Sequence, residues 1–344
     1  MKDNFLVPNN EIWYTTIDGS HITRSNLSKV TPQYIYNTKE EKGIISFDTP
    51  VVKIVEGAFR DCTALREIFI PSSVTEIGDG AFSGCVSLRE IVIPEGVTKI
   101  GESAFSGCTN LTKIIVEEGN PKYDSREECN AIIEKETNCL IAGCKNTTIL
   151  SSVTSIGVSA FSDCTDLRKI VIPSSVKSIK MSAFEGCTGL EEIVITEGVT
   201  KIGKWTFSGC TSLQKVILPK SVTKIGHRTF SGCAGLHEII IPSSVTEIGF
   251  GTFSGCTSLH EIIIPSNVTE IGFGAFSGCT DLQKIVIQSS VTKIGDYAFL
   301  GCNNIKAIYV PKKKLSSYKK RFPADIHWLI VEEGSDLPVK AENR

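Results

Sequence analysis

The sequence predicts an α/β solenoid of about 11 stacked coils, with a parallel β-sheet on one face and short strands and helical or 3₁₀ turns on the other. Three observations lead to this fold class. Ten of the 13 cysteines recur at a spacing of 23 residues, most periods hold an alternating apolar segment closed by proline, and most also hold a shorter extended piece closed by glycine. A fixed period in this range is the signature of a repeat architecture, and it replaces the separate domains that 344 residues would otherwise indicate.

The cysteine series defines the length of the repeated unit. Its members are Cys62, Cys85, Cys108, Cys164, Cys187, Cys210, Cys233, Cys256, Cys279 and Cys302. Cys108 and Cys164 are 56 residues apart, which corresponds to one regular coil and one coil with a ten-residue insertion. Because free cysteine behaves as a small hydrophobic residue and is often buried, we predict that these ten cysteines form one column of the core and not a metal cluster.

Residues 244–266 show the pattern of one unit. The segment Leu259–Ile264 ends in the alternation of a half-buried strand, and Pro265 ends this strand because proline has no N–H to continue a ladder. The segment Val245–Ile248 predicts a second, shorter strand. Between the two, the residues around Phe253 are too few for a regular helix and predict one helical or 3₁₀ turn that points Phe253 inward.

The inward phenylalanine recurs in every regular coil and predicts a second core column. Its members are Phe59, Phe82, Phe105, Phe161, Phe184, Phe207, Phe230, Phe253, Phe276 and Phe299. One coil cannot bury its apolar face alone, so each coil needs a neighbour. Because burial of a large side chain stabilises by about 1.5–3 kcal/mol, stacking offsets the entropy lost when each coil is ordered.

The repeat boundaries divide the chain into six segments. These are an N-terminal β cap at 1–50, regular repeats at 51–118, an irregular repeat with a hairpin insertion at 119–150, regular repeats at 151–310, a C-terminal cap at 311–331 and a disordered tail at 332–344. The N-terminal cap is expected because a terminal coil exposes an apolar cross-section. In it, Ile12–Thr16 with the turn at Asp18-Gly19 predicts a hairpin, and Tyr34–Tyr36 and Ile44–Phe47 predict further strands.

The C-terminal cap is predicted from a change of pattern after the last regular coil. Lys312–Lys320 predicts a short basic helix, which Pro323 ends, and Ile326–Ile330 predicts a closing strand. The residues from Glu332 onward are polar, which predicts disorder.

The insertion predicts a β-hairpin. Asn130–Glu134 and Cys139–Gly143 flank a four-residue loop, and pairing the two strands across this loop places Cys129 opposite Cys144. Two alternatives stay open: a cross-strand disulfide if the protein is exported, or two buried thiols. No zinc site is predicted, because neither a Cys-x-x-Cys pair nor a nearby histidine accompanies these cysteines.

Composition and residue patterns exclude several functions. With 36 basic and 38 acidic residues, the chain lacks the basic excess of a nucleic-acid binder. No segment approaches the roughly 20 apolar residues of a membrane span, and we expect no signal peptide in the first twenty residues. His237 and His260 share one position in successive coils, and we expect two solvated edge residues rather than a metal pair. Without a catalytic triad or paired carboxylates, we expect no enzyme activity, no cofactor and no metal.

The outward side of the sheet is the candidate functional surface. Two positions after each strand leucine the column is charged: Glu67, Glu90, Lys113, Lys169, Glu192, Lys215, Glu238, Glu261 and Lys284. Four positions after it the column is apolar: Phe69, Val92, Ile115, Val171, Val194, Ile217, Ile240, Ile263, Val286 and Tyr309. Such a stripe stabilises a sheet through stacked β-branched side chains, and it also has the features of a protein-binding surface. Both interpretations can hold together.

The unit Leu-x-x-Ile-x-Ile-Pro-x-x-Val-Thr-x-Ile-Gly-x-x-Ala-Phe-x-Gly-Cys resembles the BspA-type leucine-rich repeat over about residues 51–310. The position that holds Asn or Cys in the general leucine-rich consensus holds Ser73, Ser175, Ser244 or Asn267 here. The resemblance implies a curved right-handed solenoid. It also implies a surface adhesin that binds host matrix proteins or other bacteria.

Two functional hypotheses follow. The first is a non-catalytic, surface-exposed scaffold whose protein ligand is a host matrix protein or another bacterial surface protein. Its predicted contact residues are Val171, Val194, Ile217, Ile240, Ile263, Val286, Glu192, Lys215, Glu238 and Glu261. The second is an intracellular interaction scaffold, which the unpaired cysteine column and the expected lack of a signal peptide favour.

Overall fold

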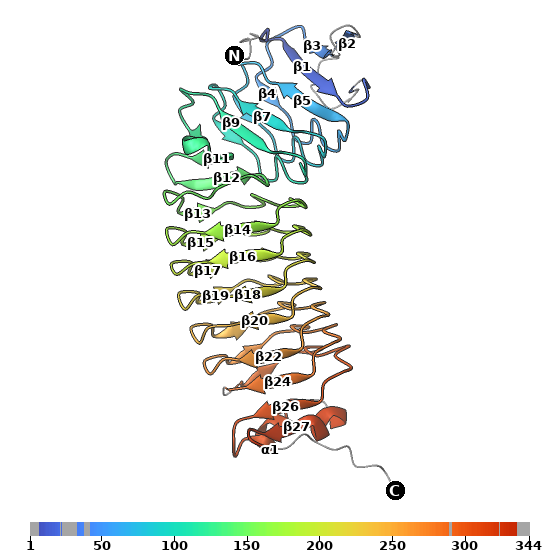
Figure 1. Ribbon diagram of the computed structural model, residues 1–344, viewed down its shortest axis with the longest axis vertical. Coiled ribbons are helices and arrows are strands. Elements are labelled where there is room, and N and C mark those ends of the chain that lie inside the picture. The colour runs from blue at the N-terminus through green and yellow to red at the C-terminus, as the bar shows by residue number, and fades with distance from the viewer. Residues whose placement is uncertain are drawn as a thin grey trace. The chain divides into compact units, whose positions relative to one another are not determined.

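The structure is a computed structural model and describes residues 7–20, 22, 33–37, 42–288, 291–322 and 324–335. The chain forms two compact units, Met1–Leu167 and Arg168–Arg344, and each is treated by itself. In each unit, successive coils lie against one another and contribute one longer strand and one short strand per turn (Figure 1). We call these the main strands and the short strands. The boundaries proposed for the caps and repeats stay predictions.

Unit 1 combines a terminal β-structure, three regular coils and the irregular coil. Its strands and 3₁₀ turn are β1 (Glu11–Thr16), β2 (Gln33–Asn37), β3 (Lys42–Ser46), β4 (Lys53–Ile54), β5 (Leu65–Phe69), β6 (Glu76–Ile77), β7 (Glu90–Ile93), β8 (Lys99–Ile100), β9 (Lys113–Val116), β10 (Tyr123–Asp124), η1 (Arg126–Glu128), β11 (Ala131–Glu134), β12 (Cys139–Gly143) and β13 (Ser155–Ile156). The neighbouring orders within unit 1 are β2-β3-β1-β5, β7-β9, β4-β6-β8 and β10-β11-β12-β13.

Unit 2 is more regular. Its main strands are β14 (Lys169–Ile172), β16 (Glu192–Ile195), β18 (Lys215–Ile217), β20 (Glu238–Ile240), β22 (Glu261–Ile264), β24 (Lys284–Ile287) and β26 (Ala307–Val310). Its short strands are β15 (Ser178–Ile179), β17 (Lys201–Ile202), β19 (Lys224–Ile225), β21 (Glu247–Ile248), β23 (Glu270–Ile271) and β25 (Lys293–Ile294). It ends with α1 (Leu315–Lys319), the 3₁₀ helix η2 (Ala324–Leu329) and β27 (Ile330–Glu332).

The strands pair in parallel with a constant offset of one repeat, which confirms the predicted parallel sheet. Ile170 of β14 pairs with Ile193 of β16, and Ile262 of β22 pairs with Ile285 of β24. The segment between a short strand and the next main strand is a series of turns rather than a regular helix, closed by bonds such as Cys256 N–H to Phe253 O (3.1 Å). The helical part of the predicted fold is therefore minor.

The phenylalanine column forms a ladder of stacked rings inside each unit. Neighbouring centroids lie 5.3 to 5.7 Å apart at Phe59–Phe82, Phe82–Phe105, Phe184–Phe207, Phe207–Phe230, Phe230–Phe253, Phe253–Phe276, Phe276–Phe299 and Phe299–Phe322. Phe207, Phe230 and Phe253 are fully buried. Offset-stacked rings at this separation attract each other in addition to the area they bury.

The cysteine column lies beside this ladder, and many of its thiols join one coil to the preceding one. The thiol of Cys256 donates to the carbonyl oxygen of Phe230 at 3.1 Å, and Cys233 repeats the contact with Phe207 at 3.0 Å. Burial raises the pKa of Cys108 and of Cys256 to about 12. As predicted, all ten repeat cysteines are buried. Each acts as a small core residue with one weak donor.

A glycine after most short strands lets the coils approach closely. A Cβ atom at Gly226 would lie 2.4 Å from the carbonyl carbon of Gly203, and one at Gly272 would lie 2.7 Å from that of Gly249. Backbone packs on backbone here, so a larger residue would push the coils apart.

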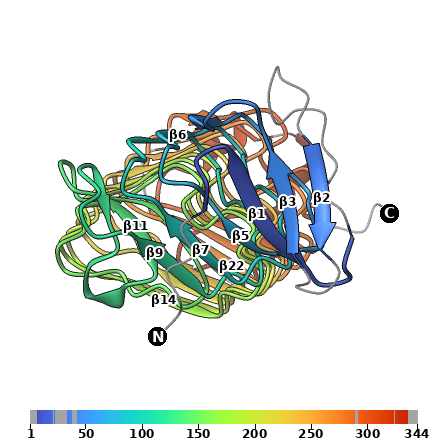
Figure 2. The same cartoon turned by 90° about the horizontal axis from the view of Figure 1, so that it is seen from above.

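The N-terminal strands are present, but their pairing differs from the predicted hairpin at Asp18-Gly19. β1 pairs antiparallel with β3 on one edge and with β5 on the other, so the turn at Asp18-Gly19 does not connect two paired strands. The neighbours β2 and β3 pair instead. Seen down the stack, β1 and β3 extend the sheet of β5 (Figure 2). The N-terminal cap therefore pairs with the edge of β5, the first main strand.

The predicted closing strand at Ile326–Ile330 is wrong in position. This segment lies mostly in η2, and the strand β27 begins at Ile330, which pairs in parallel with Ile308. Phe322 explains the shift. It lies 23 residues after Phe299 and stacks on it at 5.7 Å, so the cap follows the path of another coil. The predicted basic helix is present as α1, whereas Pro323 lies outside the described residues. The predicted disordered tail is wrong at its start, because Glu332 belongs to β27 and pairs with Val310, and residues 336–344 lie outside the described residues.

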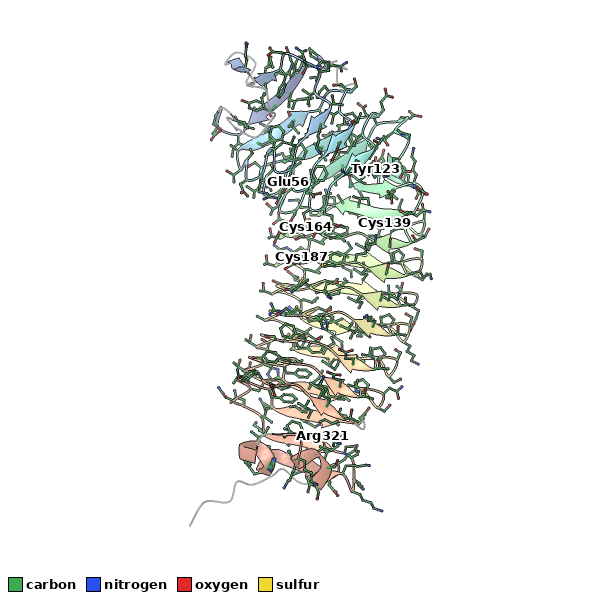
Figure 3. All side chains as sticks on the ribbon, turned by 180° about the vertical axis from the view of Figure 1, so that it is seen from behind. Glu56, Tyr123, Cys139, Cys164, Cys187 and Arg321 are labelled. Atoms are coloured by element: carbon green, nitrogen blue, oxygen red, sulfur yellow. The ribbon has the colours of Figure 1, made fainter. Side chains whose placement is uncertain are left out.

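The irregular coil is organised around Asn120, a buried polar side chain. Its amide donates to the carbonyl oxygens of Pro94 and Val97, both at 2.9 Å, and its oxygen accepts the N–H groups of Lys122 and Tyr123. Tyr123, whose N–H bonds to Asn120, lies on β10 on the same side of unit 1 as Cys139 on β12 (Figure 3). Because every polar atom of this amide is bonded, its burial carries no desolvation penalty from an unpaired group.

We expect Phe207→Ala to lower the free energy of unfolding by about 3–5 kcal/mol, because it leaves a cavity in a fully buried ladder. Denaturant unfolding followed by circular dichroism measures the change. The control is Phe273→Ala, which removes a ring that is 47% exposed and should cost less than about 1 kcal/mol. Equal costs for the two variants would contradict the assignment of inside and outside.

Candidate functional site on the outward face of the main sheet

From β14 to β24, the main strands of unit 2 alternate between buried side chains and side chains that are exposed or partly exposed. The exposed fractions are 46% for Val171, 36% for Val194, 54% for Ile217, 48% for Ile240 and 47% for Ile263. Their neighbours Ile170, Ile193, Val216, Ile239 and Ile262 are buried. Val286 also faces outward and is partly buried. The structure therefore places the predicted apolar residues on one open face, which we call the sheet-face stripe (Val171, Val194, Ile217, Ile240, Ile263 and Val286).

The parallel register aligns members of the stripe. Val171 pairs with Val194, Ile217 with Ile240, and Ile263 with Val286. Tyr309 of β26 pairs with Val286 and extends the stripe by one coil. Stacked β-branched side chains stabilise a sheet, so the stripe contributes to the fold as well as to the surface.

The charged column beside the stripe consists largely of ion pairs between adjacent coils. The distances between Nζ and the carboxylate oxygen are 2.8 Å for Lys169–Glu192, 2.8 Å for Lys215–Glu238 and 2.9 Å for Lys284–Glu261. The hydrogen bond to Glu261 raises the pKa of Lys284 above its ordinary value. Exposed pairs of this kind add only about 0.2–1 kcal/mol each to stability. Their clearer consequence is a face whose charges are largely neutralised by one another.

The same face in unit 1 carries an aromatic group that the sequence did not reveal. Val92 pairs with Ile115, and Trp13 of β1 lies directly opposite Phe69 of β5. The ammonium group of Lys42 lies 4.3 Å from the centre of the Trp13 ring. Ile12 and Tyr14 are buried, so the alternation alone predicts an outward Trp13. Its place next to Phe69 could not be predicted, because it depends on the pairing of β1 with β5.

The hairpin of the irregular coil is present with the predicted first pair. Glu134 of β11 faces Cys139 of β12, but a β-bulge between Ile132 and Ile133 shifts the register by one residue farther along. Continuing the shifted register places Asn130, rather than Cys129, opposite Cys144.

Cys129 and Cys144 are buried free thiols in the structure, which corresponds to the second alternative left open above. The Cys144 thiol donates to the carbonyl oxygen of Asn130 at 3.6 Å. Burial raises the pKa of both thiols. The proposed bridge between them stays a prediction.

Other functional classes find little support in the described ranges. His237 and His260 are both exposed at the start of main strands. Within those ranges, no three His, Cys, Asp or Glu side chains lie close enough together to hold a metal ion. A cavity lined by Phe105, Ile141 and Ala160 has room for no more than a water molecule. None of the helices in the described part of the chain has the length and apolarity to cross a membrane.

Comparison with known proteins identifies the family. The model of the BspA type leucine-rich repeat region matches residues 28–130, 131–251 and 223–323, with six copies. The chain therefore belongs to the BspA-type leucine-rich repeat family, which confirms the resemblance of the repeated unit. Leucine-rich repeats are scaffolds for protein interaction, whose function lies in sites placed on a shared fold. No curated protein matches the chain.

Two solved structures support the fold. A leucine-rich repeat protein from Bacteroides ovatus is 33% identical, with 82% of this chain and 75% of that chain covered and a TM-score of 0.57. The pneumococcal vaccine antigen PcpA is 19% identical, with 79% of this chain and 67% of that chain covered and a TM-score of 0.54. At this identity the second likeness shows the fold alone.

We expect thiol titration of the unfolded, unreduced protein to count 13 free thiols. In the folded protein at neutral pH none should react rapidly, because all 13 are buried away from the reagent. Burial also raises the pKa of thiols such as Cys108 and Cys256, which keeps them in the unreactive protonated form. A count of 11 that rises to 13 with reductant would instead show the Cys129–Cys144 bridge. The variants Cys129→Ser and Cys144→Ser, each of which should then leave every remaining thiol free, together identify the pair.

Proposed function

We propose that this chain is a non-catalytic binding scaffold whose sheet-face stripe captures a protein partner at a cell surface. The single observation that carries the proposal is the geometry of the stripe. Five aliphatic side chains from successive coils are each at least 36% exposed on one face. A contiguous apolar patch rimmed by charge is typical of a protein-binding surface.

The ion pairs beside the stripe determine how binding would work. Lys169, Lys215 and Lys284 are already neutralised by glutamates of adjacent coils, so the face offers little net charge to steer a partner. Affinity would come mainly from removing apolar area from water, at roughly 25 cal/mol per Å². The paired charges would form a polar rim that excludes mismatched partners. Binding should therefore depend weakly on salt.

The proposed partner class is a host matrix protein or another bacterial surface protein. This proposal is supported by membership of the family and by the fold shared with PcpA, which is described as a vaccine antigen. An extended, flat apolar face fits an extended partner surface better than a small molecule, which needs a concave pocket.

An intracellular interaction scaffold is the alternative. The column of ten cysteines favours it in principle, because thiols persist in reducing compartments. However, all these thiols are buried, and a buried thiol with a raised pKa is also protected in an oxidising medium. Protease treatment of intact producing cells separates the two hypotheses: early loss of this chain supports surface exposure, and protection until lysis supports the alternative.

We expect Ile217→Lys combined with Ile240→Lys to weaken capture on a panel of immobilised matrix proteins by at least about ten-fold, because it places two charges in the apolar contact. The control, Ser243→Lys with Ser266→Lys, adds the same charge at exposed turn positions outside the stripe. Circular dichroism should be unchanged in both. Capture of the stripe variant at wild-type strength would leave the stripe with a purely structural role.

A further inference from the structure

A second exposed surface lies in unit 2, in the turn between each short strand and the buried phenylalanine. In three successive coils this turn carries large apolar side chains: Phe250 is 36% exposed, Phe273 47% and Tyr297 60%, and nearby Leu300 is 58% exposed. We call these four residues the aromatic strip. They belong to a different part of each coil from the main strands, so they are not part of the sheet-face stripe.

The aromatic strip is ordered by contacts among its own rings. Phe250 and Phe273 stack with centroids 5.6 Å apart, and Tyr297 meets Phe273 edge to face at 5.3 Å. The Arg228 guanidinium lies 4.8 Å from the centre of the Phe250 ring. His227 Nδ1 accepts the backbone N–H of Phe250 at 3.1 Å. The surface is therefore held in one arrangement before any partner arrives, which lowers the entropy cost of binding.

Folding does not demand aromatic residues at the position of Phe250 and Phe273, which holds Asp296 in the coil of Tyr297. The same position of the repeat holds Glu56, Asp79 and Glu102 in unit 1, all exposed (Glu56 is labelled in Figure 3). Exposed phenylalanines carry a solubility cost that acidic residues avoid. Their occurrence in neighbouring coils of unit 2 thus requires a reason other than packing.

Next to the aromatic strip lies a cluster of cations, which we call the basic patch: Lys201, Lys204, Lys224 and Arg228. All four are exposed, and Lys201 and Lys224 lie side by side on β17 and β19. None of the four forms an ion pair with another described residue, whereas Lys169, Lys215 and Lys284 on the sheet face are each paired. Three acidic residues, Glu247, Glu270 and Asp296, lie farther on, on the short-strand side of the coils of the aromatic strip, and Glu270 pairs with Lys293. The patch therefore lacks carboxylate partners of its own.

We propose that the basic patch and the aromatic strip together bind a segment of a protein partner that carries both carboxylates and apolar side chains. The carboxylates would pair with Lys204, Lys224 and Arg228, and the apolar side chains would cover Phe250, Phe273 and Tyr297. Arginine and aromatic residues are the types enriched in the centres of protein interfaces. This partner is independent of the one proposed for the sheet face.

The ring geometry favours a protein segment over a carbohydrate. A sugar packs on the flat face of an aromatic ring, but the Phe250 ring is covered by Arg228 on one side and stacked on Phe273 on the other. Phe273 is likewise contacted by Phe250 and Tyr297. Neighbouring side chains therefore occupy part of both rings, which leaves a sugar less flat surface to pack on, whereas aliphatic and aromatic side chains can contact the rings from several directions.

Fluorescence anisotropy with a labelled peptide of alternating glutamate and leucine tests the proposal. We expect it to bind the full chain, and Phe250→Ser with Phe273→Ser to weaken binding by at least about ten-fold. Lys204→Glu with Arg228→Glu should have an effect of similar size. The control Lys220→Glu, a single charge reversal at an exposed turn, should change little, as should the sheet-face variant Ile217→Lys with Ile240→Lys.

Three results would overturn the proposal. The first is no binding of the glutamate–leucine peptide. The second is equal binding of a glutamate–serine peptide or of heparin, with no effect of the phenylalanine substitutions, which would indicate a simple polyanion site. The third is equal binding of a lysine–leucine peptide, which would indicate unspecific adhesion to exposed rings. Unfolding curves of all variants exclude loss of structure as the cause. The variant Ile217→Lys with Ile240→Lys alters only the sheet-face stripe. Its capture of matrix proteins tests the proposed function and its binding of the glutamate–leucine peptide tests the present proposal, so the two can fail separately.

Discussion

The fold depends on the constant register between successive coils. Most rings of the phenylalanine ladder stack on the ring 23 residues earlier, as Phe276 does on Phe253. Many repeat cysteines donate to the carbonyl oxygen of the phenylalanine one coil earlier, as Cys279 does to Phe253 at 3.1 Å. The phenylalanine column and the cysteine column thus both fix the offset between successive coils at one repeat. Because side chains in strands alternate, a slip by one residue would turn every buried isoleucine outward, so the core admits only this register.

Both candidate surfaces follow from this register. A residue type repeated at one position of the unit becomes a continuous line on the surface, which is how scattered valines and isoleucines form the sheet-face stripe. Where the residue type at one position of the unit differs between coils, a local surface results instead. One such position holds Glu56 and Asp79 in unit 1 and Phe250 and Phe273 in unit 2. The repeat supplies the geometry, and departures from its consensus supply specificity.

Much of the regular part of the fold could be predicted from the sequence, because period and alternation are local signals. The outward orientation of Ile217 and the burial of Cys256 follow directly from them. The pairing of β1 with β5, the bulge near Ile133 and the late start of β27 could not be predicted, since each depends on contacts between distant segments. The sequence does contain a signal for Phe322, its spacing of 23 residues from Phe299, but the surrounding pattern no longer resembles a coil.

The central claim is that the main strands present one apolar column to the solvent and bury its neighbours. Hydroxyl-radical footprinting with mass spectrometry tests it most directly, because it reports the exposure of individual side chains in the intact chain. We expect Ile217, Ile240 and Ile263 to be oxidised and Val216, Ile239 and Ile262 to be protected, and addition of a captured partner to protect the first set. Equal oxidation of both sets, or protection of Ile217 without any partner, would contradict the account.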